Sequence, residues 1–129
     1  MPEEVFGILV THGSLGGELL RTVETILGPQ GRVEVVSNAL ASAEGLAARL
    51  IAILEERNPD RVYFFVDLLG GSCDHACQEA RRARPDAAVF TGMNLPMLIE
   101  FFYQRDRVPE GELRQRLIRK GREGIQVIG

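Results

Sequence analysis

Two residues of this chain have side chains suited to group transfer, and each lies at the end of an apolar run. His12 follows "VFGILV" (5–10) after a single threonine, and Asp67 interrupts "VYFFVDLL" (62–69). A carboxylate that accepts a hydrogen bond from one nitrogen of a neutral imidazole fixes the tautomer and leaves the other nitrogen as a nucleophile. If the fold brings the two side chains together, that nitrogen can take up a phosphoryl group. Asp67 would then stabilise the positive character that the ring gains.

A bound phosphoryl group carries about −1.5 to −2 charges and needs hydrogen-bond donors. Glycine-containing turns, "GSLGG" (13–17) and "GGS" (70–72), follow the two residues. Each turn leads into a predicted helix, whose first backbone N–H groups have no partner within the helix and can bind an anion. Because glycines permit close approach of the backbone and a serine hydroxyl adds a donor, we predict that Gly13, Ser14, Gly71 and Ser72 bind the phosphoryl group.

The hydrophobic pattern predicts the elements that must position these residues. Short apolar, β-branched runs predict strands at residues 5–10, 33–37, 62–69, 87–92 and 124–129. Amphipathic stretches predict helices at residues 15–27, 43–57, 73–83, 95–105 and 110–121. This alternation predicts an α/β fold: a doubly wound, mostly parallel sheet of order 2-1-3-4 plus a C-terminal edge strand, with helices on both faces. We expect residues 1–129 to form a single domain.

The predicted strand order brings the two reactive residues to one place. Ligands of open parallel sheets bind beyond the carboxyl ends of the strands, where the winding reverses. In the order 2-1-3-4, that point lies between the first and third strands, which end at His12 and Asp67. Either residue alone could be an ordinary turn residue. Their joint position at the switch point favours a functional site.

Composition and charge argue against several other classes of function. The net charge is −3, with 18 acidic and 15 basic residues, so the chain lacks the positive excess that nucleic-acid binding requires. Its two cysteines do not make a disulfide scaffold. The N-terminus has no signal-peptide pattern, and no apolar run approaches the ~20 residues of a membrane helix. We therefore expect a cytoplasmic protein.

The segment "CDHAC" (73–77) raises the alternative of a metal or redox site. Cys73 and Cys77 are four residues apart and share one face of a helix, whereas His75 points elsewhere. Because the three donors do not converge and no second ligand cluster accompanies them, we expect no metal. The roles of Cys73, His75 and Cys77 stay open.

Three segments carry a resemblance to a known family: "GILVTHG" (7–13), "VYFFVDLLGGS" (62–72) and "TGMNLPMLIE" (91–100). Together they resemble the enzyme IIA proteins of the mannose family of the phosphoenolpyruvate-dependent sugar phosphotransferase system. The resemblance runs over essentially the whole chain in order and spacing. It implies a doubly wound α/β fold and a single mannose-type EIIA domain.

The resemblance also implies a phosphotransferase role for His12. Its Nε2 would accept a phosphoryl group from the carrier protein HPr and pass it to enzyme IIB, while Asp67 holds Nδ1 and Ser72 helps to hold the phosphoryl group. No metal or organic cofactor takes part. The resemblance further implies a homodimer in which the C-terminal strand can pair with the partner subunit. It also implies an indirect link to the membrane IIC/IID complex, so that the protein can lie at the inner face of the membrane.

The chain departs from the family pattern after "GGS", where many relatives have a proline and an asparagine-containing helix start. Here "GGSCDHAC" stands instead, which leaves the partners and the sugar class open. Two alternatives to sugar transport remain. One is a stand-alone regulatory IIA module that signals its phosphorylation state through protein contacts. The other is the phosphotransferase subunit that serves dihydroxyacetone kinase.

Overall fold

Strands and helices alternate along the described part of the chain. The computed structural model describes residues 3–39 and 41–129. The strands are β1 (Val5–Thr11), β2 (Val33–Ser37), β3 (Arg61–Val66) and β4 (Ala88–Thr91). The helices are α1 (Leu15–Leu27), α2 (Ala43–Arg57), α3 (Ser72–Ala83), α4 (Leu95–Gln104) and α5 (Glu110–Glu123). Apart from the last strand, the predicted elements are confirmed to within a few residues at their ends.

The four strands form one parallel sheet with the order β2-β1-β3-β4. This confirms the predicted doubly wound α/β fold with strand order 2-1-3-4. The register pairs Val10 of β1 with Val36 of β2 and with Val66 of β3. The carboxyl ends of these three strands therefore lie at one edge of the sheet, at the same level.

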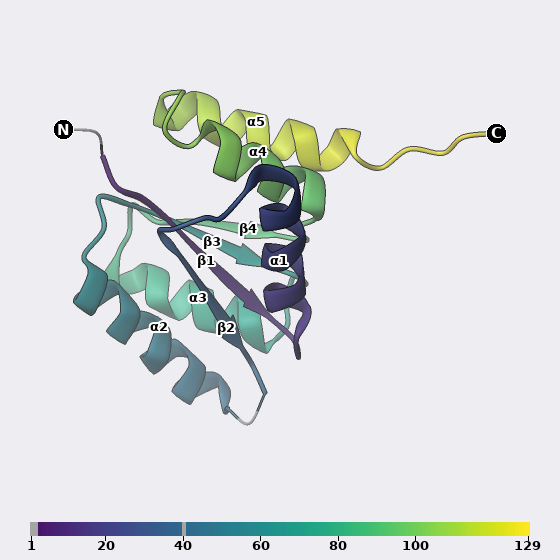
Figure 1. Ribbon diagram of the computed structural model, residues 1–129. Coiled ribbons are helices and arrows are strands. Elements are labelled where there is room, and N and C mark those ends of the chain that lie inside the picture. The colour runs from purple at the N-terminus through teal and green to yellow at the C-terminus, as the bar shows by residue number, and fades with distance from the viewer. Residues whose placement is uncertain (1–2, 40) are drawn as a thin grey trace.

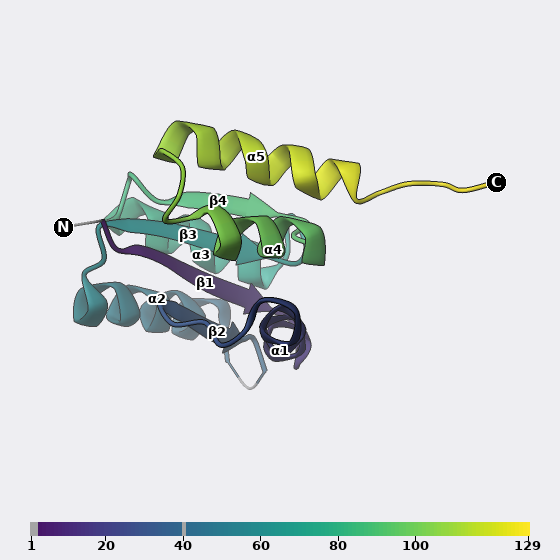
Figure 2. The same ribbon diagram turned by 45° about the horizontal axis from the view of Figure 1, so that its top comes forward.

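Helices cover both faces of the sheet, with α2 and α3 on one face and α1, α4 and α5 on the other (Figures 1 and 2). Alternate residues of β1 divide between the two layers: Phe6, Ile8 and Val10 pack with α2 and α3, and Val5 and Leu9 pack with the other helices. Every residue of β1 is therefore buried, as expected for a parallel strand covered on both faces.

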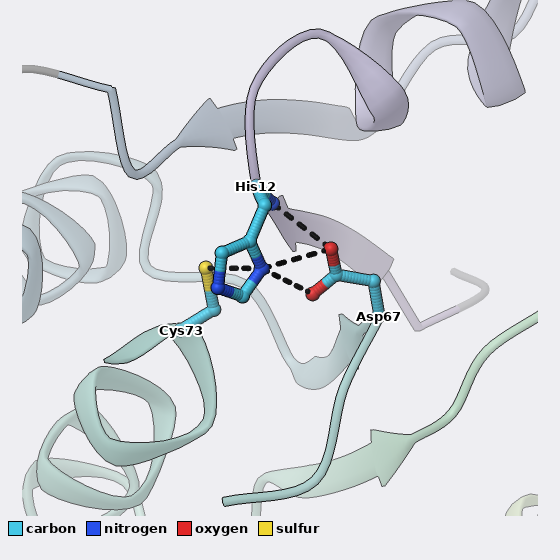
Figure 3. Close-up of side chains that lie close together, drawn as sticks. All are labelled: His12, Asp67 and Cys73. Carbon is cyan, nitrogen blue, oxygen red and sulfur yellow. Dashed lines mark hydrogen bonds and ion pairs between the residues drawn. The ribbon is translucent and has the colours of Figure 1, made fainter. Parts of the chain in front are cut away.

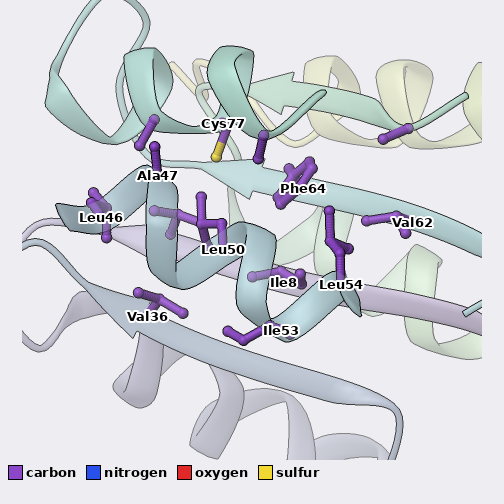
Figure 4. Close-up of a cluster of buried hydrophobic side chains, with 14 of the residues drawn as sticks. Ile8, Val36, Leu46, Ala47, Leu50, Ile53, Leu54, Val62, Phe64 and Cys77 are labelled. Atoms are coloured by element: carbon purple, nitrogen blue, oxygen red, sulfur yellow. The ribbon is translucent and has the colours of Figure 1, made fainter. Parts of the chain in front are cut away.

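The layer between the sheet, α2 and α3 is the apolar core shown in Figure 4. Leu50 of α2 and Phe64 of β3 are fully buried there. Ser42 caps the start of α2, because its hydroxyl accepts the Gly45 N–H at 3.0 Å. No helix in residues 3–39 and 41–129 combines the length and apolar character needed to cross a lipid bilayer.

The predicted C-terminal strand at residues 124–129 is not formed. The chain after α5 leads away from the sheet as an extended tail (Figure 1), and the side chains of Ile125, Val127 and Ile128 are 77%, 91% and 97% exposed. β4 has a strand only on its β3 side, so its other edge is open, but the tail does not pair with it. The apolar pattern that predicted a strand therefore has no partner among the described strands, and a strand without a neighbour leaves its backbone hydrogen bonds unmade.

Candidate active site

His12 and Asp67 lie side by side at the carboxyl edge of the sheet, as the topology predicts (Figure 3). Each is the first residue after its strand, β1 and β3 respectively. The Nδ1 atom of His12 lies 3.1 Å from Oδ1 and 3.0 Å from Oδ2 of Asp67. The backbone N–H of His12 also donates to Oδ2, at 2.9 Å. One carboxylate thus holds both the backbone and the ring of the histidine.

This contact decides which ring nitrogen is free to react. An ionised carboxylate only accepts hydrogen bonds, so Nδ1 must carry the hydrogen in the neutral imidazole, and Nε2 keeps its lone pair. The side chain of His12 is 43% exposed, whereas that of Asp67 is 12% exposed. The site therefore presents a nucleophilic nitrogen to solvent and keeps the orienting carboxylate largely buried.

The N-terminus of α3 lies beside the Cε1 and Nε2 atoms of the imidazole ring. Gly71 is the N-cap of α3 and has no side chain, so the first backbone N–H groups receive no side-chain cap. A Cβ atom at Gly71 would lie 3.4 Å from Cε1 and 3.6 Å from Nε2 of His12. The turn before it is held by the Gly70 N–H, which donates to Oδ2 of Asp74 at 2.9 Å. The positive end of the helix dipole therefore lies beside the free nitrogen.

The N-terminus of α1 is largely satisfied by the protein itself. Gly13 has a φ of +57°, in the left-handed region, and its N–H donates to Oδ1 of Asn38 at 3.2 Å. The buried hydroxyl of Thr11 accepts the Gly16 N–H at 2.7 Å. Ser14 is the exposed N-cap, but its side chain makes no capping hydrogen bond. Of the two predicted phosphoryl-binding turns, the one that starts α3 is thus the more open.

Two polar residues of the site were missed by the sequence analysis, Asn38 and Thr11. Asn38 directly follows β2, and its Nδ2 lies 3.5 Å from Oγ of Ser72, the first residue of α3. The sequence did contain a pattern that could have indicated them, since each is a polar residue at the carboxyl end of a strand next to the switch point. Thr11 is 0% exposed, and a buried hydroxyl requires a hydrogen-bond partner.

Cys73, in the first turn of α3, packs against the His12 ring (Figure 3). Its Sγ lies 3.9 Å from Nδ1, and its side chain is fully buried. Burial, reinforced by the negative charge of Asp67, raises the pKa of the Cys73 thiol. The thiol therefore stays protonated near neutral pH and acts as an apolar wall behind the ring.

His12, Asp67 and Cys73 offer nitrogen, oxygen and sulfur donors within 4.8 Å of one another. A tetrahedral zinc ion with bonds of about 2.1 Å would hold its nitrogen and oxygen ligands about 3.4 Å apart. The Nδ1 to carboxylate distances of 3.0 and 3.1 Å are instead those of a hydrogen bond. The arrangement is therefore a hydrogen-bonded pair with a neighbouring thiol, and its spacing does not fit a metal ligand set.

The other two residues of "CDHAC" that raised the metal or redox alternative, His75 and Cys77, lie apart from this site. His75 is exposed and lines a groove between α2 and α3, together with Ala47 and Ile51. Cys77 is a free cysteine that is fully buried in the core (Figure 4), where burial raises its pKa. Cys73 and Cys77 thus share one core layer, with Cys73 also against the His12 ring, whereas His75 points to the groove, in agreement with the sequence prediction that the three donors do not converge.

Comparison with known protein families gives a match over most of the chain. The family described as "PTS system fructose IIA component", EIIA-man, matches residues 7–118. The mannose-specific EIIAB component of the phosphotransferase system of Escherichia coli K12 is 32% identical over 126 residues, which cover 94% of this chain. The chain spans only 38% of the length of that relative.

Solved structures show the same fold. The phosphotransferase component EIIA of Streptococcus agalactiae has a TM-score of 0.85 at 26% identity, with 95% of this chain and 96% of that chain covered. The mannose/sorbose-specific IIA subunit of Enterococcus faecalis has a TM-score of 0.79 at 27% identity, with 100% and 96% covered. The chain therefore belongs to the EIIA-man family of the phosphoenolpyruvate-dependent sugar phosphotransferase system.

Proposed function

We propose that this EIIA component is a phosphohistidine carrier, which accepts a phosphoryl group from HPr on Nε2 of His12 and passes it to enzyme IIB. One observation carries the proposal. Asp67 engages Nδ1, and Gly71 brings the uncapped N-terminus of α3 beside Nε2. The nucleophile and a binding site for the negative charge that it acquires therefore lie together.

The transfer is an in-line exchange of one phosphorus–nitrogen bond for another. The Nε2 lone pair of His12 attacks the phosphorus of the phosphorylated donor, and the bond between phosphorus and the donor nitrogen breaks, so that its electron pair returns to the donor. Nδ1 keeps its hydrogen throughout. The phosphorylated ring gains positive character, which the adjacent Asp67 carboxylate stabilises at a distance of 3.0 Å. Transfer to IIB is the same exchange in reverse.

The phosphoryl oxygens would bind at the start of α3. The backbone N–H groups of the first turn and the hydroxyl of Ser72 are donors at this helix start, which Gly71 brings beside Nε2. Gly13 and Ser14, which precede α1, would flank the group from the other turn. The glycine at position 71 matters because any Cβ there would stand 3.6 Å from the atom that receives the phosphorus.

Exposed leucines around His12 support docking of carrier proteins at this edge. Leu68 and Leu69 follow Asp67 and are 59% and 71% exposed, and Leu15 begins α1 and is 44% exposed. Exposed apolar side chains that surround a reactive group are typical of a protein-binding surface. We assign this surface to HPr and IIB in turn, because both must bring a phosphoryl acceptor or donor to the same nitrogen.

The C-terminal tail supports a homodimer. Ile125, Val127 and Ile128 are exposed, and β4 has an open edge. Pairing of the tail with β4 of a second copy would cover the apolar side chains of the tail and supply hydrogen-bond partners to the open edge of β4. The family resemblance implies such a pairing of the C-terminal strand with the partner subunit. The dimer would work in the cytoplasm and reach the membrane IIC/IID complex through IIB.

Phosphorylation by the purified upstream proteins tests the proposal. The protein is incubated with radiolabelled phosphoenolpyruvate, enzyme I and HPr, and the label is tested for its acid lability and alkali stability. We expect label on the wild type and on His75→Ala, the matched control at the only other histidine, and none on His12→Ala. Label on His12→Ala, or none on the wild type, would overturn the proposal.

A second incubation distinguishes transport from the alternatives. The names of the similar proteins, a mannose-specific EIIAB component and a mannose/sorbose-specific IIA subunit, support transfer to a mannose-type IIB. Addition of such a IIB should drain the label from His12. Retention of the label would favour a regulatory module, and transfer to dihydroxyacetone kinase in place of IIB would favour the kinase-associated role.

A further inference from the structure

Asn38 connects all three loops that form the site. It is the first residue after β2, and its backbone N–H donates to the carbonyl oxygen of Thr11 at 3.0 Å, which extends the β1–β2 pairing by one residue. Its side chain then reaches both glycine turns: Oδ1 accepts the Gly13 N–H at 3.2 Å, and Nδ2 faces Oγ of Ser72 at 3.5 Å.

The orientation of the Asn38 carboxamide follows from its partners. The backbone N–H of Gly13 can only donate, so the amide oxygen must face it, and the amide nitrogen must face Ser72. The Ser72 hydroxyl then accepts from Asn38, which leaves its own hydrogen to be donated elsewhere. Phosphoryl oxygens only accept. Contacts in unliganded sites are often long and tighten when the ligand binds, which suits the 3.5 Å separation.

We propose that Asn38 is a positioning residue for phosphoryl transfer, which turns the Ser72 hydroxyl into a donor toward the phosphoryl group and holds the Gly13 turn beside His12. The inference rests on the proposed carrier function and adds to it the group that orders the phosphoryl-binding side chains. By accepting the Gly13 N–H, Asn38 also directs the phosphoryl group toward the N-terminus of α3 and away from that of α1.

Two substitutions separate the two contacts of Asn38. Asn38→Ala removes both. Asn38→Asp keeps an acceptor for Gly13 and the same size, but its second oxygen can only accept, so the Ser72 hydroxyl turns toward it and away from the phosphoryl group. Ser37→Ala is the matched control, because the Ser37 hydroxyl accepts the Ala39 N–H in the same loop and belongs to neither contact.

The rate of phosphorylation by HPr is measured for these variants and in the Ser72→Ala background. Reorientation of one hydroxyl hydrogen bond changes a rate by about three- to tenfold, so we expect that loss for Asn38→Ala and for Asn38→Asp. Ser37→Ala should stay within about twofold of the wild type, since it breaks no contact to the phosphoryl site. In the Ser72→Ala background Asn38→Ala can lose only its Gly13 contact, so the loss of rate that it causes should be smaller than in the wild type.

The inference would be overturned if the rate loss in the double variant equals the product of the losses caused by Asn38→Ala and Ser72→Ala alone. It would also be overturned if Asn38→Asp is phosphorylated at the wild-type rate. A second readout does not depend on phosphorylation. Amide hydrogen exchange at Gly13, followed by NMR, should speed up in Asn38→Ala and stay slow in Asn38→Asp. Unchanged exchange at Gly13 in Asn38→Ala would refute the role of Asn38 even if the carrier function holds. If instead the wild type takes up no label but exchange at Gly13 is faster in Asn38→Ala, the carrier function is refuted and the Asn38 contact is not.

Discussion

Asp67→Asn tests the argument about the His12 tautomer with almost no change in shape. The carboxylate accepts two hydrogen bonds, from the backbone N–H and from Nδ1–H of His12. A carboxamide has one oxygen and one nitrogen and can accept only from one side. If its oxygen takes the Oδ2 position on the backbone N–H, its NH₂ group takes the Oδ1 position, 3.1 Å from Nδ1. The oxygen still lies 3.0 Å from Nδ1, but the NH₂ group competes as a donor and favours the tautomer with hydrogen on Nε2, in which the nucleophilic lone pair is lost.

The expected effect follows from the hydrogen bond that must be broken to recover the reactive tautomer. A hydrogen bond to a charged group contributes about 1.5–3 kcal/mol, and each 1.4 kcal/mol changes a rate tenfold. We therefore expect phosphorylation of Asp67→Asn to be about 10- to 100-fold slower. The folded state should persist, because the asparagine oxygen can still accept from the backbone N–H.

Two measurements check this prediction. Rapid-quench labelling gives the rate of phosphoryl transfer from HPr, and ¹⁵N NMR of the imidazole reports which ring nitrogen carries the hydrogen. A thermal melt confirms that the variant is folded. A rate equal to the wild type, or an unchanged Nδ1–H tautomer in the variant, would refute the reasoning.

Three further predictions concern the rest of the site and the core. Gly71→Ala places a methyl group 3.6 Å from the reactive nitrogen, so labelling should slow while the melting temperature stays unchanged. Gly16→Ala brings a Cβ to 2.9 Å from the hydroxyl of Thr11. This overpacking should lower the free energy of unfolding by about 1–2 kcal/mol in a denaturant titration. Burial, together with the hydrogen bond to a glutamate, raises the pKa of Tyr63 well above 10.0. The stabilisation linked to this raised pKa is present below about pH 10 and is lost as the pH rises further.

Each of these predictions has a control. Gly17→Ala adds a methyl group to the same helix where nothing lies within 4 Å, so it should not destabilise the protein; an equal loss in both variants would contradict the packing argument. If Gly71→Ala slows labelling and also lowers the melting temperature, the slower labelling would reflect disruption of the fold and would contradict the argument from the methyl group. In Tyr103→Phe, Tyr63 is the only tyrosine, and its tyrosinate absorbance should appear only as the protein unfolds. Absorbance from a folded protein near pH 10 would contradict the raised pKa.

The elements, apart from the C-terminal strand, and the meeting of His12 and Asp67 could be predicted from the sequence. Strands buried on both faces leave continuous apolar runs, and the helices between them carry their own start and stop residues, so both patterns are local. Once the strands are parallel, their carboxyl ends must share one edge. His12 and Asp67 therefore had to meet near the switch point, although 55 residues separate them in the chain.

The tertiary structure decided which groups at that edge are satisfied and which stay open. Asn38 and Thr11 close the start of α1, whereas α3 keeps an uncapped N-terminus beside His12. These contacts depend on the register of β1 against its neighbours, on side-chain rotamers and on backbone conformations of single residues. No local pattern in the sequence contains that information.

The same distinction accounts for the cysteines and for the C-terminal tail. Cys73 and Cys77 share one helix face by spacing and both pack in the core layer beside α2, but only Cys73, at the start of α3, also reaches the His12 ring. The tail has the composition of a strand but pairs with none of the strands that the structure describes. The sequence alone determined the elements and the order in which they meet, because helix and strand formation depends on local periodicity. The tertiary structure decided their pairing at the edges and the hydrogen bonds of the site, because those depend on residues far apart in the chain.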